Sequence, residues 1–297
     1  LCLQEIAEYP SLNDWFAFVC DGNATAAACS TSSQGSGVSG SPFKVNHDPA
    51  FPSASNDGPV NPGGTVTFTT VGADPDTDTT PDTMTLIVCR TAGLSGGACD
   101  GGAPDTWCTS SASASNPTCN FAVPAVQPHG TLDAFVYVID NHGFESTDAP
   151  QGSNVSFDVN DVAPVVSAVT LNSGSDINLT EGSTTAVTVS ATVTDNNSCQ
   201  DIASVDTTVY RSGITYAGCD TGGEADDNNC YAIISCTVGG GTCTGSTDAA
   251  ADYSCTVNIN YHADPTDAST EYTGENWLST VIAADGAQSA NTELATG

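Results

Sequence analysis

The sequence predicts an all-β protein made of tandem β-sandwich domains. The first observation behind this prediction is the strict alternation of apolar and polar residues in runs such as 65–69 and 186–193, which is typical of half-buried strands. The second is that no stretch carries a sustained helical period. The third is an internal repeat of about 115 to 135 residues, the size of an ordinary β-sandwich domain.

The repeat is clearest in three segments that share one plan: an apolar strand, an acidic turn with glycine, and a polar return. The three segments are residues 13–26, 131–146 and 275–289. The acidic residues at their turns are Asp21, Asp140 and Asp285. Each segment resembles the hairpin between the last two strands, F and G, of an immunoglobulin-like sandwich. We therefore expect tandem immunoglobulin-like β-sandwich domains with disulfide-stapled loops.

The positions of the segments divide the chain into three domains. Residues 1–44 form the C-terminal part of a first sandwich, 45–159 a second domain, and 160–297 a third whose final strand we expect to be missing. On this interpretation the sequence is a window from a longer tandem array.

Charge and cysteine content limit the environment and the partners of the protein. The chain has 35 acidic and 3 basic residues, for a formal net charge of −32, and such a surface repels nucleic acid and anionic lipid. The sequence contains no apolar run long enough to insert in a membrane. Its 13 cysteines include no C-x-x-C pair, and its four histidines are scattered singly, so disulfides in an oxidising compartment are favoured over zinc sites.

The cysteines also agree with the domain division. The second domain holds four and the third six, while the first fragment holds three, which leaves Cys2 for a partner outside the window. Four cysteines allow three pairings and six allow fifteen, so most of the connectivity stays open. The local bridges that we favour are Cys20–Cys29, Cys89–Cys99, Cys108–Cys119 and Cys219–Cys230.

Four N-x-S/T triplets fit an exported, glycosylated surface. Their asparagines are Asn23, Asn154, Asn178 and Asn196. We therefore expect an extracellular or cell-surface protein that carries glycans.

Acidic residues recur at the positions that an immunoglobulin-like sandwich brings to one pole, namely the chain entry and the B–C and F–G loops. The first such group is Asn46, Asp48, Asp74, Asp76, Asp78, Asp82 and Asp140, and the second is Asn160, Asp161, Asp195, Asn196, Asp201 and Asp285. So many carboxylates repel one another unless a hard cation neutralises them, and Ca²⁺ accepts six to eight oxygen ligands in irregular geometry. We expect calcium at both groups. The alternative is that these acids are solvated turn residues, since Asp and Asn are favoured in turns.

Short motifs in these regions resemble known families. Residues 45–49 (VNHDP) and 159–164 (VNDVAP) resemble the interdomain linker of cadherin repeats. The loop 74–78 (DPDTD) and the turn 138–143 (VIDNHG) resemble bacterial cadherin-like and polycystic-kidney-disease-type surface repeats. The resemblance implies tandem immunoglobulin-like surface domains.

The motifs of the common hydrolases and nucleotide-binding enzymes are absent, so we expect a protein that is not an enzyme. The favoured function is an extracellular structural repeat protein, such as a surface stalk, a surface-layer protein or a filament subunit, that is stiffened by disulfides and calcium and self-associates into a fibre or lattice. The alternatives are an adhesin that binds a host or neighbour-cell ligand, or a carbohydrate-binding accessory region of a larger secreted protein.

Overall fold

The computed structural model describes residues 46–76, 82–219 and 227–286 in full. It also gives the backbone of Asp220 and of five short strands, which are β1 (Leu12–Asn13), β2 (Phe16–Ala17), β3 (Gln34–Gly35), β4 (Phe43–Lys44) and β23 (Thr292–Thr296). β1 pairs with β4 and β2 with β3. The predicted residues Cys20, Asn23, Cys29 and Asp78 lie outside the described residues.

The chain divides into two compact units. The first unit comprises Leu1–Gly58, Thr65–Phe121 and Leu132–Phe157, and the second comprises Pro59–Gly64, Ala122–Thr131 and Asp158–Gly297. Both consist almost entirely of antiparallel strands, which confirms the all-β prediction. None of the helices in the described parts of the chain is long and apolar enough to cross a membrane.

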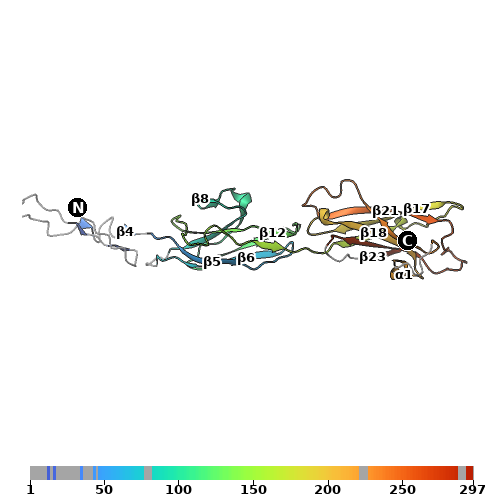
Figure 1. Ribbon diagram of the computed structural model, residues 1–297, viewed down its shortest axis with the longest axis horizontal. Helices are drawn as coiled ribbons and strands as arrows, with labels where there is room; N and C mark the ends of the chain where they lie inside the picture. The colour runs from blue at the N-terminus through green and yellow to red at the C-terminus, as the bar shows by residue number, and fades with distance from the viewer. Residues whose placement is uncertain are drawn as a thin grey trace, which may run out of the picture. The chain divides into compact units, whose positions relative to one another are not determined.

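The first unit contains two main sheets, with strand orders β11-β6-β5 and β10-β7-β13-β14. Their bounds are β5 Ala50–Asn56, β6 Thr65–Ala73, β7 Met84–Cys89, β10 Thr106–Thr109, β11 Thr118–Ala122, β13 Phe135–Asp140 and β14 Ser153–Asn154. A small hairpin of β8 (Leu94–Ser95) and β9 (Ala98–Cys99) stands out from these sheets (Figure 1). A 3₁₀ helix covers Ala103–Asp105 and precedes β10. Two further strands are β12 (Gly130–Leu132) and β15 (Phe157–Val159).

Alternation along β6 shows why this sequence forms a strand. Val66, Phe68 and Thr70 are buried, whereas Thr65 and Thr69 face solvent. The buried residues of β6 lie on one face, because successive side chains of a strand point to opposite faces. An edge-to-face contact of the Phe68 and Phe157 rings, with centroids 5.9 Å apart, adds aromatic packing to this core.

The second unit contains two four-stranded sheets, ordered β16-β17-β21-β20 and β19-β18-β22-β23. Their bounds are β16 Val165–Leu171, β17 Thr184–Thr194, β18 Ser204–Arg211, β19 Cys230–Ser235, β20 Thr237–Val238, β21 Ala250–Asn260, β22 Trp277–Ala284 and β23 Thr292–Thr296. One short helix, α1 (Tyr216–Asp220), follows β18, and 3₁₀ helices cover Asn172–Gly174 and Cys199–Asp201.

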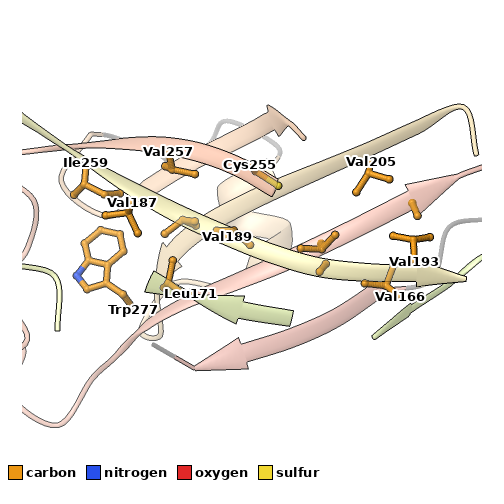
Figure 2. Close-up of a cluster of buried hydrophobic side chains, with 14 of the residues drawn as sticks. Val166, Leu171, Val187, Val189, Val193, Val205, Cys255, Val257, Ile259 and Trp277 are labelled. Atoms are coloured by element: carbon orange, nitrogen blue, oxygen red, sulfur yellow. The ribbon is translucent and has the colours of Figure 1, made fainter. Parts of the chain in front are cut away.

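The two sheets of the second unit share one hydrophobic core. Val187 and Val189 of β17 lie in the same cluster as Val205 of β18, so the two inner faces pack on each other. In Figure 2 the indole of Trp277 lies at one end of this cluster beside Val187 and Ile259. Trp277 lies on β22 and is 9% exposed.

One expectation about the third domain is corrected. The backbone of residues 292–296 forms β23, which pairs with β22 from Leu278↔Thr296 to Ile282↔Thr292, so a strand does follow the turn at Asp285. Its sequence, TELAT, is short and half polar and gives little sign of a strand. Pairing with β22 supplies the hydrogen bonds that stabilise it in this position.

Five disulfides join cysteines of the described residues. They are Cys89–Cys99, Cys108–Cys119, Cys199–Cys243, Cys219–Cys230 and Cys236–Cys255. Three of them are the local bridges named from the sequence, and the other two resolve pairings that the sequence left open. Since the loops that they close are rich in small polar residues and bury little apolar area, the bridges supply stability that a larger core would otherwise give.

The two arginines of the described residues both stack on aromatic rings. Arg211 is 7% exposed, its guanidinium lies 3.8 Å from the centre of the Tyr272 ring, and it forms ion pairs with Asp264 and Glu275. Arg90 lies 4.0 Å from the centre of the Trp107 ring. Such contacts combine charge with the electron-rich ring face.

We expect the bridge that closes the longer loop of the second unit to stabilise it more. Cys199–Cys243 spans 44 residues and Cys219–Cys230 spans 11. Loop-closure entropy predicts a loss of about 4 kcal/mol for the first pair and about 3 kcal/mol for the second. Urea unfolding of the Cys199→Ala/Cys243→Ala and Cys219→Ala/Cys230→Ala variants tests this order, and a larger loss for the shorter loop would contradict it.

Candidate metal-binding sites

Three carboxylates of the first unit converge between β6 and β7. Asp74 and Asp76 follow β6, and Asp82 precedes β7. One carboxylate oxygen from each lies within 4.8 Å of the others. We name these three residues the first acidic site.

Local hydrogen bonds hold the first acidic site in place. The Asp76 amide donates to Asp74 Oδ1 at 2.8 Å, and the Asp82 amide donates to the Asp76 carbonyl at 3.1 Å. His47 contacts both oxygens of Asp76, through its amide at 2.7 Å and through Nδ1 at 2.8 Å. These hydrogen bonds fix the positions of the Asp74 and Asp76 carboxylates and join the backbone at Asp82 to that at Asp76.

The electrostatics of this site favour a bound cation. Asp74 is 5% exposed, and its Oδ2 is buried with no hydrogen-bond partner among the described residues. Burial raises the pKa of Asp74, and the charges of Asp76, Asp82 and Asp140 raise it further. A buried carboxylate beside like charges costs free energy that a cation would offset. Its oxygens are the ligands that Ca²⁺ prefers, so the residues fit the expected ion.

The other described residues predicted for the first group lie outside the cluster of three carboxylates, and two of them accept hydrogen bonds from nearby residues. Asp140 accepts from the amides of His142 and Phe144 with Oδ1 and from Asn46 Nδ2 with Oδ2, so it stabilises the turn after β13. Asp48 accepts from the amide and hydroxyl of Thr147. Asn46 keeps a buried Oδ1 with no hydrogen-bond partner among the described residues, and this oxygen remains a possible ligand.

A second cluster lies within the second unit. His129 Nε2 lies 3.4 Å from Asp201 Oδ1. One ring nitrogen of His129 and one carboxylate oxygen each of Asp161 and Asp201 lie within 4.8 Å of one another. We name His129, Asp161 and Asp201 the second acidic site. Burial raises the pKa of Asp161, as do the charges of Asp285 and Asp201, while His129 lowers it.

A fully buried asparagine organises the backbone around the second acidic site. Asn197 Oδ1 accepts from the Val162 amide at 2.7 Å, and its Nδ2 donates to the carbonyls of Gln127 at 3.1 Å and Asn160 at 3.0 Å. Asn197 therefore joins the segment that precedes His129 to both neighbours of Asp161. Its own amide donates to Asp195 Oδ1 at 2.7 Å.

The structure places the remaining predicted residues of the second group around this network. Asp195 is fully buried, and burial raises its pKa, with further contributions from the charges of Asp201 and Asp285. Asn160 donates from Nδ2 to Asn61 Oδ1. Asn196 is exposed, and only its carbonyl takes part, as acceptor from the Gln127 amide. His129 and Asn197 could not be predicted from the sequence, because neither belongs to a local motif.

Three asparagines of the predicted glycosylation triplets lie within the described residues, and all three are exposed: Asn154, Asn178 and Asn196. The amide of Asn154 is already used, since Nδ2 donates to Asp133 Oδ1 and Oδ1 accepts from the Ala134 amide.

The second unit also carries a polar groove of about 690 Å³. Residues 175–179 and 261–267 line it together with Asn276 and Trp277. Tyr261 is 50% exposed at this groove, and the indole nitrogen of Trp277 donates to the Asp264 carbonyl. The groove therefore combines an exposed aromatic ring with several carboxylates and amides.

Comparison with known proteins identifies no family for this chain. No protein-family model and no curated protein sequence matches the chain. Among solved structures the chain is similar to the Yersinia pseudotuberculosis adhesin InvE, with 12% sequence identity and a TM-score of 0.30 over 84% of this chain. The match covers 58% of that protein, so the chain spans little more than half of its length. The cadherin-like and polycystic-kidney-disease-type resemblance rests on short motifs alone.

In the absence of metal we expect Asp74 to make the first unit more stable as pH falls from 7 toward 3.8, the ordinary pKa of an aspartate. The folded-state pKa of Asp74 is raised above its ordinary value of 3.8, so the stability linked to its protonation is complete below 3.8 and is lost as pH rises through the raised pKa. Asp74→Asn should remove this dependence and, at pH 7, stabilise the unit by on the order of 1 kcal/mol.

Calorimetry in chelator at both pH values measures this effect. Asp48 does not interfere, because the hydrogen bond from the Thr147 side chain lowers its pKa, and its contribution is lost only at lower pH. Asp100→Asn, an exposed carboxylate of the same unit, is the matched control. Equal pH dependence in the parent and Asp74→Asn would contradict the assignment.

Proposed function

We propose that this chain is part of an extracellular structural repeat protein, such as a surface stalk, a surface-layer protein or a filament subunit, and that it is not an enzyme. Five disulfides within the described residues support an oxidising compartment. A net charge of −32 supports long-term solubility outside the cell. We also propose that exposed asparagine triplets carry glycans and that copies of the protein associate, because open sheets have edge strands able to pair.

The observation that carries this proposal is the first acidic site. Its three carboxylates lie in the loop between two strands from different sheets, β6 and β7. A calcium ion bound by Asp74, Asp76 and Asp82 would tie the ends of these strands together. The ion would act as a cross-link in a protein that has little core per residue, much as the disulfides do.

Calcium should therefore raise the melting temperature of the first unit, and the double variant Asp76→Asn/Asp82→Asn should lose this response. Binding to the folded form alone stabilises by mass action, about 2.7 kcal/mol when the calcium concentration is 100 times Kd. In chelator the same variant should equal or exceed the parent in stability, because it removes repulsion. Calorimetry in millimolar calcium and in chelator makes the comparison, with Asp100→Asn as control. If calcium does not change the melting temperature of the parent protein, the calcium site is wrong and these acids are solvated turn residues.

A second candidate function is adhesion, and the groove of the second unit favours it. Aromatic rings stack on the apolar faces of sugars, and carboxylates and amides bond to hydroxyls. The groove offers Tyr261 for stacking, with Asp267 and Asn276 among the polar groups that line it. We propose a glycan as its ligand.

Tyr261→Ala should weaken binding of any glycan that the parent protein binds, by about tenfold or more, since truncation of a central aromatic contact commonly costs over 1 kcal/mol. Screening on a glycan array followed by titration of the best ligand measures the effect. Phe144→Ala is the matched control, because Phe144 is a similarly exposed ring, 54%, in the first unit. Absence of any glycan ligand, or equal affinity of Tyr261→Ala and the parent, would argue against adhesion through this groove.

A further inference from the structure

The two acidic sites differ in one donor atom. In the first acidic site the clustered atoms are all carboxylate oxygens, and His47 Nδ1 and His142 Nδ1 each lie beside a single carboxylate, at 2.8 Å from Asp76 and 3.1 Å from Asp82. In the second acidic site a ring nitrogen of His129 belongs to the cluster itself, together with oxygens of Asp161 and Asp201. Calcium takes oxygen ligands, while an imidazole nitrogen suits zinc and other late first-row metals. Zinc accepts both His nitrogen and Asp oxygen, and in zinc sites with three protein ligands a water completes the coordination.

The ligands of the second acidic site are held before any ion arrives. Asn197 binds the chain two residues before His129 and on both sides of Asp161. Asp201 ends the 3₁₀ helix Cys199–Asp201, whose first residue is joined to Cys243, and its amide donates to the Ser198 carbonyl at 2.9 Å. Each ligand is therefore within two residues of a fixed point, which is the preorganisation that a metal site requires.

Independent support comes from oxygens that the protein leaves unpaired. Asp161 Oδ1 and Asp201 Oδ2 are buried without a hydrogen-bond partner among the described residues. The same holds for Oδ2 of Asp195, a side chain that is fully buried and feels the charge of Asp201. The contact of His129 with Asp201 Oδ1 satisfies none of these three atoms. Buried carboxylate oxygens are normally paired, so a simple ion pair with His129 does not account for the arrangement.

From this donor set we propose that the second acidic site binds a zinc-like transition-metal dication through His129, Asp161 and Asp201, in preference to calcium. Asp195 adds negative charge close by and stabilises the bound cation. This assignment replaces the calcium expected there from sequence, and it is independent of the calcium proposed at the first acidic site, which uses other residues.

Titration calorimetry of the metal-free 297-residue chain with Zn²⁺ alone and with Ca²⁺ alone tests the proposal. His129→Ala should weaken zinc binding by at least about tenfold, since even the loss of a group that only supports a metal ligand costs 10- to 100-fold. His262→Ala is the matched control and should bind as the parent does. Co²⁺ provides a second measurement, because its visible absorption reports direct coordination and should be lost in His129→Ala.

His129 is half exposed, with 47% of its side chain accessible, and circular dichroism will show whether His129→Ala folds as the parent does. Asp201→Asn should weaken zinc binding as His129→Ala does, while Asp76→Asn/Asp82→Asn should bind zinc as the parent does. Equal zinc affinity of the parent and His129→Ala, tighter binding of calcium than zinc at this site, or loss of zinc binding in Asp76→Asn/Asp82→Asn would each overturn the proposal.

Discussion

A carboxylate taken out of water must be matched by a cation or by hydrogen bonds, and this constraint shapes most of the structure. Among the described residues, Arg211 supplies a permanent cation to the carboxylates of Asp264 and Glu275. Elsewhere it relies on amide donors, as at Asp140, which accepts two backbone N–H groups and the Asn46 side chain. At the acidic sites the described residues provide too few donors, since each site retains buried oxygens with no hydrogen-bond partner among them.

Hydrogen bonds and disulfides explain how loops that are poor in apolar residues keep a fixed shape. Around the second acidic site, Asn197 replaces part of a hydrophobic core with directed hydrogen bonds, and the Cys199–Cys243 bridge anchors the neighbouring 3₁₀ helix. A buried polar network stabilises a fold only when its donors and acceptors are all paired. The conformation of the segments around the second acidic site therefore depends on whether its carboxylates are paired with a cation or a proton. Apolar packing is left to the strands, where Val187 and Val189 meet the opposite sheet.

The strands could be predicted from the sequence because their signal is local. The run 186–193 alternates as β17 does, and the turn at Asp140 follows β13 as the repeat indicates. The acidic sites could be predicted only in outline: Asp74, Asp76 and Asp82 converge, but Asp140 serves the turn instead. His129 could not be found, because hydrogen bonds of Asn197 join the segment before it to the neighbours of Asp161, and no spacing in the sequence reports such a contact.

The scarcity of basic residues has a consequence for the lifetime of the protein. An endopeptidase that cleaves after lysine or arginine finds only three candidate bonds in 297 residues, after Lys44, Arg90 and Arg211. At Arg211 the side chain that such an enzyme must accept in its specificity pocket is 7% exposed and held by Tyr272, Asp264 and Glu275. Cleavage there requires local unfolding of the second unit, because the side chain must first leave these partners. Digestion by trypsin-like enzymes is thus restricted by both composition and fold.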